Sequence, residues 1–292
     1  MSDFRKHERC RICESEKLIK FLDLGDQPLA NLFPKTKEEV EGKYPLEVYW
    51  CENCNLVQLG VVVSKEKLFS DYIYFSSGMP KLSNHFKSYA EDIINRFSAK
   101  ENSVLEIASN DGILLKFFKD SGFKTLGVDP AKNVAEVAQN LGVETIVDFF
   151  TEDLAEKIAI THGKFNVIIA NNVVAHIDNH HDLVRGIKKL LMPERGVFVF
   201  EAPYLVDMFE NLTYDTIYHE HLSYLAIRPL KKLFDQYGLD IFDVEVHEVQ
   251  GRSLRVFVCR KGYQVVKKSV QNYIDLELEM GLDKIESYQK LF

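Results

Sequence analysis

The 292-residue sequence has no excess of basic residues, since 36 Lys and Arg face 44 Asp and Glu for a formal net charge of -8. A surface that binds nucleic acid of any sequence needs the opposite balance, because Lys and Arg must displace phosphate counterions. No run approaches the ~20 apolar residues of a membrane span, and the first ten residues lack the apolar core of a signal peptide. These absences predict a cytoplasmic protein without nucleic-acid or membrane partners, and they favour a small-molecule ligand.

The sequence also lacks internal repeats, low-complexity tracts and linkers rich in Pro, Gly or Ser, so domain boundaries follow from changes in pattern. Residues 1–70 are turn-rich and contain paired cysteines, which predicts a small zinc-binding domain. Residues 71–264 contain an amphipathic helix over 81–97 and then alternating strands and helices, which predicts one large domain. Residues 265–292 carry apolar residues at helical spacing and predict a C-terminal helix.

Alternation of apolar strands with helices predicts a doubly wound, mostly parallel α/β sheet. Strands are expected at 104–108, 125–129, 145–147, 165–170 and 196–201. Helices are expected at 113–120, 131–141 and 181–192. After a long insert, a helix at 229–237 precedes two closing strands at 241–249 and 254–259. The fold class is therefore a Rossmann-like, seven-stranded methyltransferase sheet with a small N-terminal zinc-binding domain.

Four of the five cysteines form two CxxC pairs, Cys10 with Cys13 and Cys51 with Cys54. Each pair places two thiolates on one tight turn, and two such turns close a tetrahedral zinc site with bonds near ~2.3 Å. Four thiolates leave no open coordination position, so the zinc is expected to be structural. Structural or redox-active thiols are the alternative, although no thioredoxin-like unit accompanies the pairs.

Cofactor residues are expected beyond the carboxyl ends of the strands, where an open parallel sheet binds its ligand. The first such turn has Ala108 and Asn110 where a dinucleotide-binding motif has glycine. Asp111 would repel a pyrophosphate, whereas carboxylates favour the ammonium and sulfonium groups of S-adenosylmethionine. Asp129, which ends the second strand, is placed to accept ribose hydroxyl protons. The expected cofactor-binding residues are Glu106, Ala108, Asn110, Asp111, Gly112, Asp129, Asp148, Phe149 and Asn171.

An aromatic and polar insert after the fifth strand ends in the run Tyr218-His-Glu-His-Leu-Ser-Tyr224. Tyr218 and His221 are three residues apart and would face one way on a helical turn. Methylation of carbon requires removal of a proton beside a carbonyl, which needs a base near neutrality and a partner for the enolate oxygen. Histidine and tyrosine supply these functions; a structural histidine among core tyrosines is the alternative. A second metal on His176, His219 and His221 lacks a further ligand at motif spacing.

Several of these motifs together resemble the nucleotide-sugar C-methyltransferases that act on TDP-4-keto-deoxysugars. They are the two CxxC pairs, SNDG at 109–112, NNVVAH at 171–176, EAPY at 201–204, YHEHLSY at 218–224 and SLRV at 253–256. The resemblance spans nearly the whole chain. It implies that S-adenosylmethionine and a TDP-sugar bind together and that the methyl group is transferred to C-3 beside the C-4 ketone.

The resemblance also implies a role for each catalytic candidate. His221 would be the base that removes the C-3 proton, and Tyr218 and Glu220 would bind or polarise the sugar. His176 would position the ketone or shuttle a proton. The expected substrate-binding residues are Tyr72 and Tyr74, which would close over the sugar, together with Asn172 and Glu201.

The chain departs from the family pattern at Ala108 and Arg252, where the family usually has glycine. Family members also usually continue for roughly a hundred residues into another α/β domain, and 265–292 resembles the helix that leads into it. Two alternatives therefore stay open beside the sugar C-methyltransferase. One is an O- or N-methyltransferase of another small molecule, and the other is a catalytically inactive zinc-containing binding module.

Overall fold

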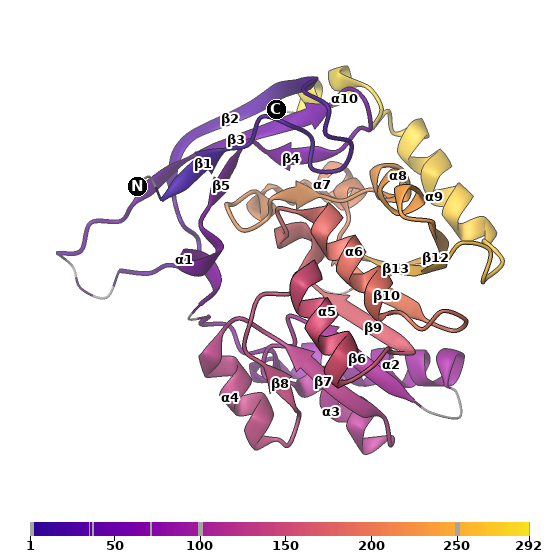
Figure 1. Ribbon diagram of the computed structural model, residues 1–292. Coiled ribbons are helices and arrows are strands. Elements are labelled where there is room, and N and C mark those ends of the chain that lie inside the picture. Colours follow the sequence, from indigo (N-terminus) through magenta and orange to yellow (C-terminus); the bar gives the residue numbers. More distant parts are fainter. Residues whose placement is uncertain are drawn as a thin grey trace.

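A seven-stranded sheet forms the larger part of the molecule, with a smaller N-terminal sheet above it in Figure 1. The computed structural model describes residues 3–34, 36, 38–70, 72–98, 102–248 and 252–291. Strand order in the large sheet is β12-β13-β10-β9-β6-β7-β8. The strands are β6 (Ser103–Ile107), β7 (Lys124–Val128), β8 (Thr145–Ile146), β9 (Val167–Asn171), β10 (Val197–Pro203), β12 (Leu239–Glu248) and β13 (Arg252–Arg260).

The first five of these strands are parallel, and β13 pairs antiparallel with both β10 and β12. This arrangement confirms the predicted doubly wound sheet. The chain reverses its direction of progress through the sheet between β6 and β9, which are neighbours. In open α/β sheets the ligand binds in the crevice at this point, outside the carboxyl ends of the strands.

Helices cover both faces of the sheet, so its central strands are apolar on both sides. On β9, Val167 and Ile169 face one core, which α2 (Pro80–Phe97) and α3 (Ile113–Asp120) complete. Ile168 and Ala170 face the other core, which α5 (Glu152–Thr161), α6 (His180–Leu190) and α8 (Ile227–Gln236) complete. Each fully buried Val or Ile stabilises the fold by about 1.5–3 kcal/mol. Helix α4 (Lys132–Asn140) follows β7.

The N-terminal region builds a four-stranded antiparallel sheet in the order β11-β4-β3-β2. Its strands are β2 (Leu18–Pro28), β3 (Lys43–Cys51), β4 (Val57–Leu59) and the two-residue β11 (Ser223–Tyr224). A separate pair, β1 (Phe4–Lys6) with β5 (Val61–Val63), precedes the short helix α1 (Lys65–Phe69). Strand β11 belongs to the aromatic insert, so the insert and the cysteine-bearing region share one sheet. The boundaries at residues 70 and 264 stay predictions.

The C-terminal segment forms two helices, α9 (Lys268–Glu279) and α10 (Ile285–Leu291), where one was predicted. The break falls at Gly281, whose φ of +71° is left-handed and ends α9. Helix α10 then folds back, because Tyr288 is buried against Phe21 and Trp50 of the N-terminal sheet. Helix α9 is fixed by Glu277, whose carboxylate accepts the first backbone N–H groups of α8 from Ile227 and Arg228.

Three further α-helices, the short α1 among them, were absent from the prediction. Helix α5 begins after Thr151, whose side chain accepts the N–H of Leu154, and α7 (Leu205–Asn211) opens the aromatic insert. The last residue of the predicted strand at 241–249 lies outside the described residues. No helix in the described ranges has the length and apolar composition that crossing a bilayer requires.

Candidate active site

The four paired cysteines converge on one point, with their sulfur atoms all within 4.8 Å of one another. The Sγ atoms of Cys10 and Cys54 are 3.3 Å apart, and those of Cys13 and Cys51 are 3.5 Å apart. A tetrahedral zinc with bonds near 2.3 Å separates its sulfur ligands by about 3.8 Å, so the cluster fits the ion closely. Four thiolates fill the coordination sphere, which makes the predicted zinc a structural ion.

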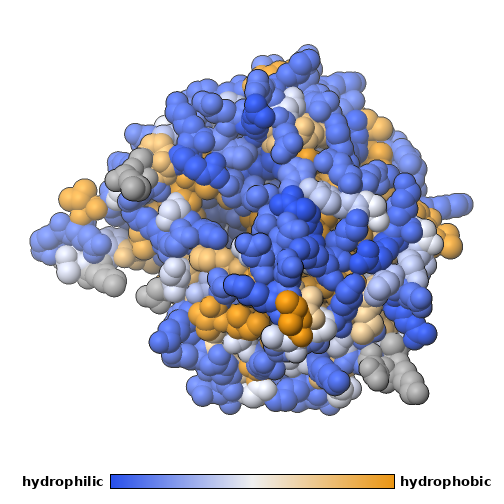
Figure 2. All heavy atoms as spheres, viewed as in Figure 1, coloured by the Kyte–Doolittle hydropathy of each residue, from blue (hydrophilic) through white to orange (hydrophobic). Residues whose placement is uncertain are grey.

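A cavity of about 1010 Å³ lies at the carboxyl edge of the large sheet and reaches the N-terminal region. Figure 2 shows a shaded recess left of the centre of a mostly hydrophilic face, between the upper and lower parts of the molecule. Thirteen of the predicted site residues line the cavity. They are Tyr72, Tyr74, Glu106, Ala108, Asn110, Asp129, Phe149, Asn171, Asn172, His176, Tyr218, Glu220 and His221.

The turn after β6 holds three residues in the left-handed region of φ. Gly112 has φ of +76°, and a Cβ there would lie 2.9 Å from the Cβ of Ala138, so only glycine fits. Ala108 and Asn110 have φ of +56° and +49°, which is uncommon for residues with a side chain. Such strain is maintained by surrounding structure and clusters at ligand sites. Ala108 therefore keeps the backbone conformation that glycine would adopt at its position.

Glu106 provides the main electrostatic feature of this turn. Its side chain is buried, and its Oε2 atom has no hydrogen-bond partner among the described residues. Burial, followed by the nearby charges of Asp111 and Asp129, raises the pKa of Glu106 well above its usual value. A buried acid without a partner is costly, and a cation relieves that cost. The site therefore fits the positively charged end of S-adenosylmethionine.

Asp129 lies across the same turn at the end of β7. Its Oδ2 accepts the N–H of Asn110 at 2.8 Å, and its Oδ1 accepts the N–H of Ala131 at 2.9 Å. Burial raises the pKa of Asp129 despite these bonds. Each carboxylate oxygen can accept more than one hydrogen bond, so both remain able to accept from a ribose hydroxyl.

Four predicted site residues lie outside the cavity lining. Gly112 serves the turn, and the exposed Asp148 accepts the N–H of Phe149. Asp111 is fully buried, and its Oδ2 accepts the N–H of Ser77 at 2.8 Å.

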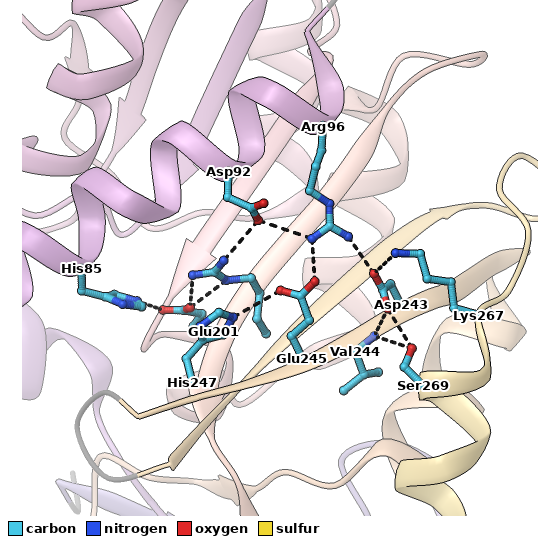
Figure 3. A network of polar contacts seen from close by, with 11 residues as sticks. His85, Asp92, Arg96, Glu201, Asp243, Val244, Glu245, His247, Lys267 and Ser269 are labelled. Carbon is cyan, nitrogen blue, oxygen red and sulfur yellow. Dashed lines mark hydrogen bonds and ion pairs between the residues drawn. The ribbon is translucent and has the colours of Figure 1, made fainter.

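Glu201, the fourth, belongs to a polar network beneath α2 (Figure 3). Its Oε2 lies 2.7 Å from Nε2 of His85, and its Oε1 accepts Nε of Arg255 at 2.8 Å. Both oxygens are therefore occupied by protein groups.

The catalytic candidates Tyr218 and His221 contact each other directly. They lie in a hydrogen-bonded turn in place of the predicted helical one, with the N–H of His221 donating to the Tyr218 carbonyl at 3.0 Å. The Tyr218 hydroxyl lies 2.8 Å from Nε2 of His221, and Nδ1 of His221 lies 2.7 Å from the carbonyl of Thr216. A carbonyl only accepts, so Nδ1 carries the proton and Nε2 accepts from the hydroxyl. Burial lowers the pKa of His221 to about 4, below the near-neutral value expected for the base, and this leaves the imidazole neutral at pH 7.

The other two catalytic candidates flank this pair. The ring of His176 lies 5.0 Å from that of His221 and stacks on Phe69 of α1. Burial, then the neighbouring His221, lowers the pKa of His176 well below its usual value. Burial raises the pKa of Glu220, whose carboxylate accepts Nδ2 of Asn31 at 2.7 Å and the Tyr72 hydroxyl at 3.5 Å.

The sequence did not predict the groups that the N-terminal region, and the linker that joins it to α2, bring to the cavity. Asn31 and Phe69 line it, and no spacing in the sequence distinguishes them. The side chain of Asn110 accepts the N–H of Ser76 and donates to the carbonyl of Tyr74, both at 2.9 Å. The linker that carries Tyr72 and Tyr74 is thus bound to the cofactor turn.

His219 is turned away from the cavity lining, with Nε2 3.1 Å from the carbonyl of Tyr44. Within the described part of the chain, the four cysteines are the one group of three or more residues with metal-binding geometry. A second metal on the histidines therefore has no structural support.

Comparison with known proteins decides the family. The family described as "Methyltransferase domain" matches residues 83–244, and the family described as "Putative zinc binding domain" matches residues 10–69. The C-methyltransferase NovU of Streptomyces niveus is 32% identical over 290 residues, which cover 98% of this chain and 69% of NovU. The chain belongs to the C-methyltransferase family that includes NovU.

This C-methyltransferase is an S-adenosylmethionine-dependent enzyme whose N-terminal region has four cysteines positioned to bind zinc. The plantazolicin methyltransferase BpumL, solved with a pentazolic desmethylPZN analog and SAH, superposes on it with a TM-score of 0.50. That likeness, at 11% identity, covers 63% of this chain and 87% of BpumL. It shows the shared fold of the catalytic sheet.

Proposed function

We propose that this methyltransferase methylates C-3 beside the C-4 ketone of a nucleotide-linked keto-deoxysugar of the TDP type. One observation carries the proposal. The neutral His221, hydrogen-bonded to Tyr218, lies in the same cavity as the buried, unpartnered carboxylate of Glu106. A base for a carbon acid and a site for a cationic methyl donor therefore line one cavity.

The cavity has room for both ligands. Its volume of about 1010 Å³ is at the upper end of the usual range for small-molecule sites. Bound S-adenosylmethionine supplies an electrophilic methyl group. Glu106 would bind its ammonium group, Asp129 its ribose hydroxyls, and Phe149, Asn171 and the turn at 108–112 would complete its site.

His221 would accept the C-3 proton at Nε2. Since Nδ1 keeps its proton toward the Thr216 carbonyl, the imidazolium formed in this step would be stabilised by that hydrogen bond. Tyr218 occupies Nε2 in the structure, so an arriving substrate must redirect its hydroxyl. The hydroxyl would then donate to the ketone oxygen, where negative charge develops as the proton leaves.

The remaining candidates would hold the sugar. Glu220 already links Asn31 of the N-terminal region with the Tyr72 hydroxyl, so a sugar bound there would contact both sides of the cavity. His176, whose ring stacks on Phe69 and lies 5.0 Å from that of His221, would position the ketone. Asn172 and Tyr74 would contact the sugar. Glu201 would have a structural role instead, because His85 and Arg255 occupy both of its carboxylate oxygens.

Incubation with labelled S-adenosylmethionine and a panel of nucleotide-linked 4-keto sugars tests the proposal. The expected product carries the label on the carbon beside the ketone, as located by NMR. Label on oxygen or nitrogen would indicate methylation of another small molecule. If calorimetry with zinc-loaded protein detects neither S-adenosylmethionine nor S-adenosylhomocysteine binding, the chain is a binding module and the proposal fails. A cytoplasmic location stays part of the proposal.

A further inference from the structure

Asp178 is a meeting point between the zinc-binding region and the cavity. It lies in the short loop between His176 and α6, and it lines the cavity. Three basic side chains of the N-terminal region reach its carboxylate: Arg5 contacts Oδ2, His7 lies 3.6 Å from Oδ1, and Arg11 donates to Oδ1 at 3.1 Å. The loop that carries His176 is therefore bound to the N-terminal region through the carboxylate of Asp178.

Arg11 differs from the other two because it is itself part of the zinc site. It lies between Cys10 and Cys13, and its side chain is 0% exposed, against 56% for Arg5 and 18% for His7. The Arg11 Nη1 donates to the carbonyl of Leu59 at 2.7 Å. Each of these contacts limits where the guanidinium can lie.

The backbone around Arg11 is fixed as well. The amide side chain of the fully buried Gln58 accepts the N–H of Arg11 and donates to the carbonyl of Arg9, both at 2.9 Å. A buried guanidinium is stable only with its partners in place, so Arg11 and Asp178 constrain each other. The zinc, the CxxC turn and the loop after His176 thus form one connected structure.

We propose that Arg11 is a positioning residue through which the zinc site holds the loop at 173–179, and with it His176, against His221. Apolar packing of Val174 and Ala175 and the Asn179 cap of α6 also hold the loop, but its contacts with the N-terminal region's charged side chains are made through Asp178. A zinc ion with no open coordination position thereby affects catalysis through structure alone. The effect on the methylation rate rests on the proposed function, whereas the physical coupling does not.

Hydrogen exchange followed by mass spectrometry measures the coupling without any substrate. In Arg11→Met, the amides at 173–179 should exchange at least about tenfold faster than in the wild type, because the loop opens locally once its tie is lost. Arg9→Met is the matched control, since Arg9 also neighbours Cys10 but is 64% exposed and pairs with Glu16. Both variants should keep full zinc content. Exchange in Arg11→Met that equals exchange in Arg9→Met overturns the proposal.

Asp178→Asn weakens the same contact with Arg11 from the side of the loop. It provides the test if Arg11→Met does not fold. This side chain is 27% exposed, and the substitution preserves its shape while removing its charge. Faster exchange at 173–179 with zinc retained is expected, and unchanged exchange contradicts the coupling. In the folded variants kcat should fall at least about fivefold while the cofactor dissociation constant stays within twofold, which distinguishes positioning from a general folding defect. If the keto sugars prove not to be substrates, the exchange result still stands.

Discussion

Two buried glutamates, on the strands that lie on either side of β9 in the large sheet, have opposite surroundings. Glu201 on β10 is held between His85 and Arg255, and although burial raises its pKa, these partners outweigh burial and lower it. Glu106 on β6 forms no ion pair with any described residue, and its pKa is raised well above the usual value. The same residue type at similar depth therefore has its charge matched by protein groups at Glu201 and left unmatched at Glu106.

A third buried glutamate is an intermediate case. Glu277 accepts backbone N–H groups from Ile227 at 2.6 Å and Arg228 at 3.1 Å, and the Tyr204 hydroxyl at 3.0 Å. Burial raises its pKa to about 7, against the effect of these bonds. Hydrogen bonds without a salt bridge thus leave the charge only partly compensated.

The largest loss of stability is expected at the four-cysteine cluster, whose partner is a metal ion. Cys51→Ser removes one thiolate of four, and the binding free energy of a structural zinc is of order 10 kcal/mol in small zinc domains, so zinc content and stability should both fall. Elemental analysis and thermal unfolding of purified protein measure the two effects. Cys259→Ser, at the free cysteine outside the cluster, is the control and should keep its zinc. Wild-type protein that is reduced, unchelated and free of zinc would contradict the assignment.

Glu201→Ala should destabilise the protein, because it removes the glutamate whose charge is matched by His85 and Arg255. Among the described residues it leaves the buried Arg255 with Asp92, at 3.4 Å, as its one carboxylate partner, and loss of one partner from a buried pair costs about 3–5 kcal/mol. Urea unfolding should show a lower midpoint with an unchanged slope. Glu106→Gln, the matched control, removes an unpaired charge and should unfold at the wild-type midpoint or above it. Equal destabilisation in the two variants would remove the distinction between the two glutamates.

Glu277 predicts a pH dependence of stability. Because its folded pKa of about 7 exceeds the unfolded value of 4.5, the folded state binds more protons between these values. Stability from this group is fully present below pH 4.5 and is lost as pH rises through about 7, by up to about 3 kcal/mol. The difference in unfolding free energy between wild type and Glu277→Gln should follow this curve. A difference that is flat from pH 4.5 to 8 would contradict the raised pKa.

The smallest effects concern cofactor affinity. Asp129→Ala should weaken binding of S-adenosylhomocysteine by about 1–3 kcal/mol, because a buried acceptor of hydroxyl protons is lost. Glu106→Gln should weaken it by a similar amount, since the cationic end loses its countercharge. Isothermal calorimetry gives both values, with Asp148→Ala, exposed and outside the cavity lining, as the control. Dissociation constants equal to the wild type would exclude this placement of the cofactor.

The sequence predicts those features that depend on local pattern. Apolar alternation locates the strands around Glu106, Asp129 and Asn171, and the CxxC spacing locates the zinc. Long-range pairing decides the rest. Strand register sets Arg255 directly opposite Glu201, and no feature of EAPY at 201–204 reveals that neighbour. The contribution of Asn31 to the cavity likewise depends on how the N-terminal sheet packs on the insert.

Tertiary contacts also explain the errors at the C-terminus. The apolar residues of 265–292 fit one helix by periodicity, but burial of Tyr288 against Trp50 favours a break at Gly281. Helix α5 could have been predicted, since Thr151 precedes Leu154, Ala155 and Ile158 at helical spacing. The two-residue strand β11 is too short to leave a pattern.

The central claim is that His221 removes a proton from carbon. The most direct measurement uses S-adenosylhomocysteine in place of the methyl donor, with a TDP-linked 4-keto sugar in heavy water, and follows deuterium entering beside the ketone by NMR. Wild-type protein should exchange this proton, and His221→Ala should lose ~10² to 10⁴ in rate while binding the cofactor product normally. Tyr218→Phe should lose less. Exchange at the wild-type rate in His221→Ala, together with its loss in Tyr218→Phe, would contradict the assignment and make Tyr218 the base.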